Sequence, residues 1–207
     1  AGFKDINVIS GGSALDTLTG LDADSHWAIN AANSGVYTST NALTFTTTDT
    51  LIGGSAADHF DVADGASLSG LVNGGGGTDL LDYADYTTVV TVDLSSGQTT
   101  GINANNPAGV SLVEDITGGS NADSLTGDSG PNTITGSAGD DQLIGLGGND
   151  TYIFADGWGR DTLSDSGGLG GRCAGSAGAG GGAIRWVLRG SPTDRGREPH
   201  SRAGDGW

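Results

Sequence analysis

The residues with the clearest chemical potential are aspartates that recur at nine-residue intervals. Abutting nonapeptides occupy residues 118–126, 127–135, 136–144 and 145–153, and a further one follows a two-residue insertion at 156–164. The sixth residue of each is Asp or Asn, namely Asp123, Asn132, Asp141, Asp150 and Asp161. Carboxylate and carbonyl oxygens are the ligands of Ca²⁺, which takes about six to eight of them in a flexible shell. The spacing therefore predicts a row of calcium sites.

Three isolated nonapeptides with the same frame precede this row, at residues 11–19, 53–61 and 74–82. Their sixth residues are Asp16, Asp58 and Asp79. An aspartate in such a place either binds a cation or closes a turn through local hydrogen bonds, and both interpretations stay open for these copies. Asp79 is the strongest candidate of the three, because Gly74–Gly77 supplies the fullest set of glycines.

The elements that must position these carboxylates are short strands joined by glycine turns. Glycine at the early positions permits a positive φ and lets backbone carbonyls converge. Alternation over positions 7, 8 and 9 predicts a short strand whose eighth side chain, always apolar, faces a core. Segments 36–54 and 87–97 are rich in Val and Thr and also predict strands. The sequence thus predicts an all-β fold.

Composition excludes several other classes. The 207 residues include 40 Gly, 25 Asp and Glu against 8 Lys and Arg, and 1 Cys, with a net charge of −17. So many glycines disfavour a helical bundle, and the acidity disfavours nucleic acid and anionic membranes as partners. One cysteine cannot build a disulfide framework, and no apolar run of about 18 residues is present to span a bilayer. Cations are the favoured partners.

The charge changes sign near residue 171. Residues 1–171 carry a net charge of −20, whereas residues 172–207 carry +3 and show no sustained strand or helix period. We expect this Gly- and Arg-rich end, with Cys173, to be a disordered tail or an out-of-frame translation. The chain begins Ala-Gly-Phe and contains no Met, which indicates a fragment of a longer protein.

The nonapeptides resemble the hemolysin-type, repeats-in-toxin (RTX) family, whose Gly-Gly-x-Gly-x-Asp-x-apolar-x unit is a calcium-binding repeat. The resemblance covers residues 118–164 well. It implies a right-handed parallel β-roll, a β-solenoid or parallel β-helix in which each unit stacks on the unit two places along, with Ca²⁺ between successive turns.

On that register the resemblance implies particular ligands. Asp123 and Asp141 would share one ion, assisted by the carbonyls of four turn residues. These residues are Gly118, Ser120, Gly136 and Ala138. Asn132 and Asp150 would share a second, weaker ion, because Asn132 is uncharged and Pro131 stiffens its turn. Asp161 would continue the row of Asp141.

The expected organisation has three parts: an irregular β-rich lead-in at 1–112, the calcium-binding β-roll at 113–166, and the tail at 167–207. The expected function is that of a calcium-binding structural module in a larger secreted bacterial protein, which folds on Ca²⁺ outside the cell. The resemblance implies type I secretion and an extracellular or cell-surface location. Expected partners are Ca²⁺, other domains of the parent chain and possible surface or polysaccharide ligands, with no nucleic acid and no membrane span.

Two alternatives stay open: a fragment of a β-helix carbohydrate-active enzyme, such as a lyase or epimerase, or an adhesin or surface-layer segment. The common catalytic motifs are absent, and His26, His59 and His200 do not have a metal-binding spacing, which favours a non-enzymatic role with no catalytic residues. The Thr-rich segment 44–50 could form a hydroxyl row for ice or carbohydrate, but Thr is also simply a good strand former.

Overall fold

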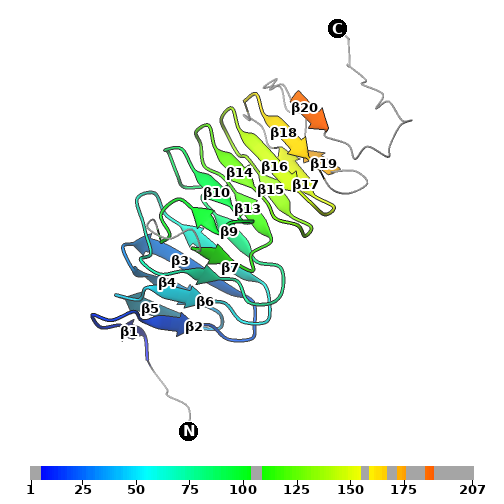
Figure 1. The fold of residues 1–207 in the computed structure, drawn as a ribbon. Helices are drawn as coiled ribbons and strands as arrows, with labels where there is room; N and C mark the ends of the chain where they lie inside the picture. The colour runs from blue at the N-terminus through cyan, green and yellow to red at the C-terminus, as the bar shows by residue number, and fades with distance from the viewer. Residues whose placement is uncertain (1–5, 104–108, 155–158, 167–171, 176–184, 189–207) are drawn as a thin grey trace.

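The computed structural model describes residues 6–103, 109–154, 159–166, 172–175 and 185–188. These residues form strands and turns with no helix, and hence no helix that could cross a membrane (Figure 1). The strands are β1 (Val8–Ser10), β2 (Thr17–Thr19), β3 (Ser25–Ala31), β4 (Ser34–Thr38), β5 (Ala42–Thr46), β6 (Thr50–Ile52), β7 (Asp58–Val62), β8 (Val72–Asn73), β9 (Leu80–Asp82), β10 (Thr91–Asp93), β11 (Gln98–Thr99), β12 (Val110–Ser111), β13 (Asp115–Thr117), β14 (Ser124–Thr126), β15 (Thr133–Thr135), β16 (Gln142–Leu146), β17 (Thr151–Phe154), β18 (Thr162–Asp165), β19 (Arg172–Gly175) and β20 (Arg185–Leu188). The predicted all-β class is confirmed.

Three sheets share these strands. The long sheet has the order β1-β5-β4-β3-β7-β9-β13-β15-β17-β19. One short sheet, β12-β8-β6-β2, accompanies its N-terminal part, and another, β11-β10-β14-β16-β18-β20, accompanies its C-terminal part. Most neighbours are parallel; the antiparallel pairs are β3–β4, β4–β5 and β10–β11. Successive strands therefore alternate between two facing sheets in the C-terminal part of the chain (Figure 1).

The strand register follows the nonapeptide repeat. In the long sheet Ile116 pairs with Ile134, and Ile134 pairs with Tyr152, each 18 residues along. In the C-terminal short sheet Leu125 pairs with Leu143. Each unit thus pairs with the unit two places along, as the sequence predicted. We call two consecutive units, which add one strand to each sheet, a layer.

The eighth-position side chains form the core between the sheets. Leu81, Ile116, Ile134, Leu143 and Tyr152 are each 0% exposed. Burial of one such side chain contributes about 1.5–3 kcal/mol. At the N-terminal end the core is aromatic, because the ring of Trp27 packs against the rings of Tyr37, Phe45 and Phe60.

The long sheet runs through the predicted boundary at residues 112 and 113, since Leu81 in β9 pairs directly with Ile116 in β13. The isolated units at 53–61 and 74–82 contribute β7 and β9 to this sheet. They therefore belong to the same stack as the later nonapeptides. The three-part division of the chain stays a prediction.

The structure differs from the sequence prediction at two places in the C-terminal segment. β19 pairs in parallel with β17, and β20 pairs in parallel with β18. The backbone of an edge strand offers unpaired N–H and C=O groups, which any segment can pair with regardless of its hydrophobic period. The rest of 167–207, predicted to be disordered, lies outside the described residues.

Candidate metal centre

The sixth-position side chains point into the turns rather than into solvent. Asp79, Asp150 and Asp161 are 1% exposed, Asp141 is 2% exposed, and Asp123 is 3% exposed. A carboxylate so deeply buried requires hydrogen bonds or a counter-charge. The turns must therefore supply one or both.

One oxygen of each carboxylate is hydrogen-bonded to the adjacent layer. The Asp123 N–H donates to Asp141 Oδ1 at 2.8 Å, and the Asp141 N–H donates to Asp161 Oδ1 at 3.0 Å. At the opposite edge the Asn132 N–H donates to Asp150 Oδ1 at 3.0 Å. These bonds form a ladder that joins the backbone of one layer to the side chain of the next.

The other side-chain oxygen divides the turns into two groups. In the first group, which we call capped turns, it accepts the N–H of the residue at position 2. The bonds run from Gly12 to Asp16 at 2.5 Å, from Gly54 to Asp58 at 2.6 Å, and from Gly119 to Asp123 at 2.6 Å. The turn of Asn132 belongs to the same group, because the single side-chain oxygen of Asn132 accepts the Asp128 N–H at 2.9 Å. A side chain in a capped turn closes its own turn, which is the alternative considered for the isolated copies.

In the second group, which we call open turns, this oxygen has no hydrogen-bond partner among the described residues. It belongs to Asp79, Asp141 and Asp150, and each of these oxygens is buried. Asp161 Oδ2 is also buried without a partner, although part of its turn lies outside the described residues. Buried carboxylate oxygens without a partner are rare in proteins, and a bound ion or water is a common reason for them.

The backbone explains the division. Open turns have positive φ at positions 2 and 4, at Gly75 and Gly77, Ser137 and Gly139, and Leu146 and Gly148. No positive φ occurs at these positions in the capped turns. Position 4 is Gly in every open turn, whereas it is Ala14, Ala56, Asn121 or Gly130 in the capped turns.

Glycine at position 4 adopts the left-handed conformation without strain, and the other residue types do so at a cost. Gly130 is the exception, and it precedes Pro131, which restricts the preceding residue to extended conformations. The predicted stiffening by Pro131 therefore has a specific consequence, which is a capped turn.

The first-position glycines complete each site. A Cβ on Gly136 would collide with Asp141 Oδ2, and one on Gly145 would collide with Asp150 Oδ2. A Cβ on Gly118 would lie 2.9 Å from the carbonyl oxygen of Gly136 in the next layer. Oxygens from a side chain and from a neighbouring backbone thus meet where a first-position side chain would be.

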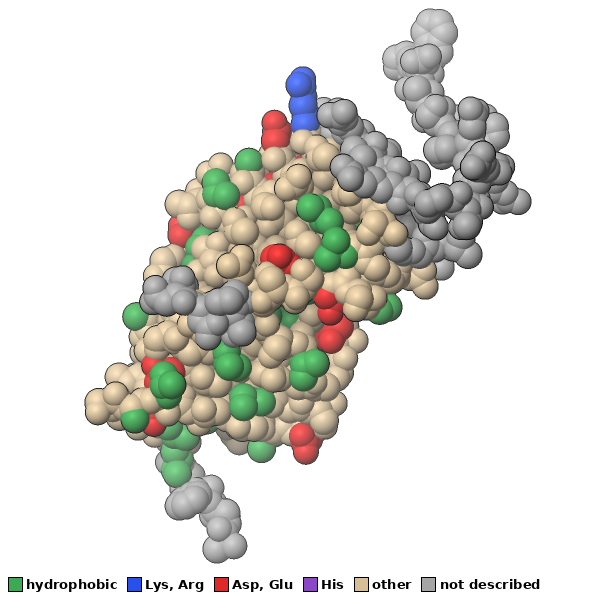
Figure 2. Space-filling view, in the orientation of Figure 1, with side chains coloured by type: hydrophobic (Ala, Val, Ile, Leu, Met, Phe, Trp, Pro, Cys, Tyr) green, Lys and Arg blue, Asp and Glu red, His purple; other side chains and the backbone are tan. Residues whose placement is uncertain are grey.

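The electrostatics of the open turns favour a bound cation. Burial raises the pKa of Asp141 to about 7 and the pKa values of Asp79 and Asp150 to about 6, with neighbouring carboxylates adding to the effect. Among residues whose side chains are described, Arg160 is the only Lys or Arg. Figure 2 shows acidic side chains scattered over the visible face. The described side chains therefore provide almost no compensating positive charge.

The donor set fits a hard cation such as Ca²⁺. Within the described parts of the chain no three Asp, Glu, His or Cys side chains converge on one metal position, so backbone carbonyls would complete any shell. Carbonyl and carboxylate oxygens are the ligands that Ca²⁺ prefers, whereas softer metals require nitrogen or sulfur. The buried, unpartnered carboxylate oxygens and the oxygens gathered around the first-position glycines agree with this chemistry.

The predicted carbonyl ligands occupy the Asp123 and Asp141 turns. The Gly118 carbonyl accepts a hydrogen bond from Ser137 Oγ at 3.0 Å. The Ala138 N–H donates to the Gly119 carbonyl at 3.3 Å, and the Ser120 N–H donates to the Tyr86 carbonyl at 2.9 Å. The two turns are therefore stacked as predicted. They differ in that Asp123 has both carboxylate oxygens hydrogen-bonded, whereas Asp141 has one free.

Glu114 is a site residue that the sequence prediction missed. Its Oε2 accepts the Asp79 N–H at 2.9 Å, and its carbonyl accepts Asn132 Nδ2 at 2.8 Å. Residues 109–117 form a further degenerate unit with Glu114 at position 6 and Ile116 at position 8. Extending the nonapeptide frame one unit upstream would have found it, had Glu been allowed at position 6.

A second titratable cluster lies on the outer face of β3, β7 and β9. The rings of His26 and His59 are 4.9 Å apart. His59 Nε2 is 2.9 Å from Asp82 Oδ2, and His26 Nε2 is 3.7 Å from Asp61 Oδ2. These histidines lie at the surface, as expected, although the fold brings two of them together. His200 lies outside the described residues.

We expect Asp82→Asn to lower the pKa of His59. The hydrogen bond to Asp82 raises the pKa of His59 above its ordinary value of 6.5, against the opposing effect of burial. The folded protein thus binds this proton more tightly than the unfolded chain, so the pair stabilises the fold fully below pH 6.5. That contribution is lost as the pH rises through the folded-state pKa.

NMR titration of the His59 ring protons checks this expectation, with Asp22→Asn as a remote control. Unfolding of wild type and Asp82→Asn at pH 6 and 8 should differ more at pH 6, by a few tenths of a kcal/mol because the pair is half-exposed. An unchanged His59 pKa in Asp82→Asn would show that the ion pair does not form in solution.

The fold and the site together define a class of protein: parallel strands stacked in layers, with buried carboxylates at turns that repeat every nine residues. Residues 117–152 match the family model of the RTX calcium-binding nonapeptide repeat in four copies. This segment therefore consists of RTX repeats, as the sequence predicted. RTX nonapeptide repeats bind calcium, and RTX proteins are typically exported by type I secretion. A comparison with curated proteins gave no match.

Proposed function

We propose that residues 113–166 form a β-roll whose coils are held together by Ca²⁺, and that this β-roll is a structural module of a larger secreted bacterial protein. The observation that carries the proposal is the set of buried, unpartnered carboxylate oxygens of Asp79, Asp141, Asp150 and Asp161. They occur at turns of a stack whose segment 117–152 matches a calcium-binding repeat.

The open turns are the primary sites in this proposal. Asp141, Asp150 and Asp161 each offer one oxygen to a cation while the other holds the ladder, and Asp79 does the same upstream. Asp123 and Asn132 remain secondary candidates, because the second carboxylate oxygen of Asp123 and the single side-chain oxygen of Asn132 already accept a backbone N–H. The carbonyls of Gly118, Ser120, Gly136 and Ala138 lie in the turns that would complete the shells.

Folding coupled to metal binding follows from this arrangement. Without a cation, the buried carboxylates of Asp141 and its neighbours repel one another and resist ionisation. Bound Ca²⁺ supplies the compensating positive charge, so that its binding free energy becomes folding free energy. Extracellular calcium modules work at about 10⁻⁴–10⁻³ M Ca²⁺, so the chain would stay unfolded in the cytoplasm and fold after export.

The burial of these carboxylates favours the structural role over the lyase or epimerase alternative. A catalytic acid or base must reach the proton that it transfers. The sixth-position aspartates of the open turns are at most 2% exposed, so no polysaccharide could reach them in the folded stack. The proposed location is extracellular, either secreted or attached to the cell surface.

We expect millimolar Ca²⁺ to increase the β-sheet signal in far-ultraviolet circular dichroism of the full chain. The increase should reverse with chelator and should be much smaller with Mg²⁺, which demands a tighter octahedral shell and dehydrates reluctantly. Identical spectra in chelator and in millimolar Ca²⁺ would contradict calcium-coupled folding.

A further inference from the structure

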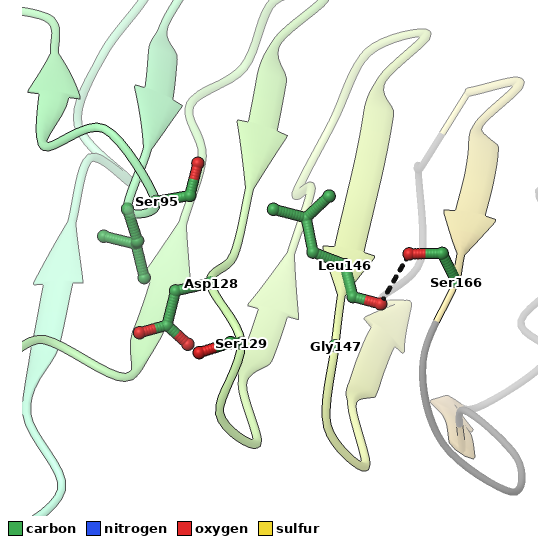
Figure 3. Close-up of a pocket in the computed structure, with 7 residues that line it drawn as sticks. Ser95, Asp128, Ser129, Leu146, Gly147 and Ser166 are labelled. Carbon is green, nitrogen blue, oxygen red and sulfur yellow. Dashed lines mark hydrogen bonds between the residues drawn. The ribbon is translucent and has the colours of Figure 1, made fainter.

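A polar groove crosses the stack at the edge where β14 and β16 lead into β15 and β17 (Figure 3). Its volume is about 340 Å³, within the range of small-ligand sites. The lining residues are Leu94, Ser95, Asp128, Ser129, Leu146, Gly147 and Ser166. The calcium-site proposal uses none of these side chains as a ligand.

Two of the residues that line the groove break the nonapeptide pattern. Asp128 and Leu146 stand at position 2 of their units, where the repeat normally has glycine. Leu146 has a φ of 66°, which is strained for a bulky residue. Strained and pattern-breaking residues concentrate at functional sites. Here they place an aliphatic surface and a carboxylate on one groove.

Two of the groove's polar groups are free to bind a ligand. Asp128 uses Oδ1 to accept the Gly130 N–H at 2.7 Å, while its Oδ2 accepts no hydrogen bond within the described part of the chain. The Ser129 hydroxyl likewise makes none there. The Ser95 hydroxyl donates to Asp93, and the Ser166 hydroxyl donates to the Leu146 carbonyl at 2.9 Å.

Backbone hydrogen bonds join the groove-lining turns of neighbouring layers. The Leu94 N–H donates to the Thr126 carbonyl, the Gly147 N–H to the Asp128 carbonyl, and the Ser166 N–H to the Leu146 carbonyl. Hydroxyl or aliphatic groups therefore recur along the groove at the strand spacing of about 4.8 Å. This spacing is close to the length of one pyranose ring. A linear saccharide lying along the stack would meet the turn after one strand at each sugar. In the order of the strands, these turns supply Leu94 and Ser95, then Asp128 and Ser129, then Leu146 and Gly147, and then Ser166.

We propose that this groove binds a linear, neutral oligosaccharide. Hydroxyls and a carboxylate oxygen suit sugar hydroxyls, which both donate and accept hydrogen bonds. Leu94 and Leu146 would contact the apolar C–H faces of the sugars. Acidic glycans are disfavoured, because Asp128 lines the groove and residues 1–171 carry a net charge of −20. The inference rests on the proposed function, since the groove exists only when the coils are stacked.

Calorimetry on the full chain in millimolar Ca²⁺ tests the proposal, with cellohexaose, mannohexaose and hexagalacturonate as probes. We expect at least one neutral hexasaccharide to bind and hexagalacturonate to bind at least tenfold more weakly. Ser129→Tyr, which fills the groove, should weaken binding at least tenfold. Ser13→Tyr, at the same nonapeptide position in the first unit, should leave binding unchanged.

Circular dichroism on the same samples separates this proposal from calcium-coupled folding. If Ca²⁺ folds the chain but neither cellohexaose nor mannohexaose binds, the groove assignment alone is overturned. Tighter binding of hexagalacturonate, or an equal loss of binding in Ser129→Tyr and Ser13→Tyr, would overturn it as well. A third outcome is a chain whose circular dichroism spectrum does not change with Ca²⁺ but which binds a saccharide, with the binding abolished by Ser129→Tyr. That outcome would support the groove and overturn calcium-coupled folding.

Discussion

Asp141→Asn should be more stable than wild type in chelator at pH 8, and less stable than wild type in millimolar Ca²⁺. The pKa of Asp141 is raised to about 7 by burial, so at pH 8 the wild type carries a buried and uncompensated charge when no cation is present. Asparagine removes that charge but keeps an oxygen that can accept the Asp123 N–H. Asn132 shows that an amide is tolerated at position 6, where its Oδ1 accepts the N–H of Asp128 in the same turn.

Asp141→Ala should lose stability in both conditions relative to Asp141→Asn. Alanine leaves the Asp123 N–H without its acceptor in a buried turn, and an orphaned buried donor costs about 1–3 kcal/mol. Denaturant unfolding with and without Ca²⁺ measures all three proteins. The comparison separates the ladder, which only alanine breaks, from the cation site, which both substitutions remove.

Asp123→Asn is the control for the response to Ca²⁺, because both Asp123 oxygens accept backbone hydrogen bonds and neither is left for a cation. Asparagine keeps only one of these bonds, so the size of the calcium response is compared between the variants and not their absolute stability. We expect this variant to retain most of the calcium response that Asp141→Asn loses. An equal loss in the two variants would contradict the distinction between capped and open turns. It would instead favour one ion shared by Asp123 and Asp141, as the family register implies.

Gly74→Ala is expected to destabilise the calcium-bound protein by about 3 kcal/mol, at the upper end of the range for overpacking. The added Cβ would collide with the Leu112 carbonyl oxygen and with Asp79 Oδ2. The first of these is backbone and cannot rotate away. The substitution therefore forces the β8–β9 turn apart from the next layer and displaces the carboxylate of an open turn.

Gly76→Ala, in the same turn, is the control for Gly74→Ala. Its Cβ would meet nothing closer than Ser55 Cα at 3.7 Å, which is ordinary contact. We expect a change within about 0.5 kcal/mol, typical of surface substitutions. Thermal unfolding in millimolar Ca²⁺ distinguishes the two variants. Similar unfolding midpoints for the two variants would show that the space beside Gly74 can accept a methyl group.

The nonapeptide pattern was enough to predict the strands and the core, and the resemblance to RTX repeats implied how the units stack. Position 8 is apolar in every unit, and an alternating strand must turn that side chain away from water. The expected register, with Leu143 paired with Leu125 and Tyr152 paired with Ile134, is confirmed. A register slip by one residue would expose the whole row of apolar side chains. Local period and burial therefore specify this part of the fold.

Other features depend on residues far apart in the chain. His26 and His59 are 33 residues apart and meet only because β3 pairs with β7. The groove draws on Ser95, Ser129 and Ser166, which follow β10, β14 and β18 in different layers. β19 and β20 pair with edge strands although their sequence has no strand period. No local pattern encodes these neighbours, since strand pairing sets them.

The sequence by itself determined that acidic residues recur every nine positions beside glycine turns, and this suffices to predict a calcium-binding repeat. Only the tertiary structure decided which carboxylates have an oxygen left for a cation. Asp123 and Asp141 occupy the same position of the repeat, yet one is capped by the Gly119 N–H and the other is not. The reason is the backbone conformation at positions 2 and 4, which turns the second-position N–H toward the carboxylate or away from it.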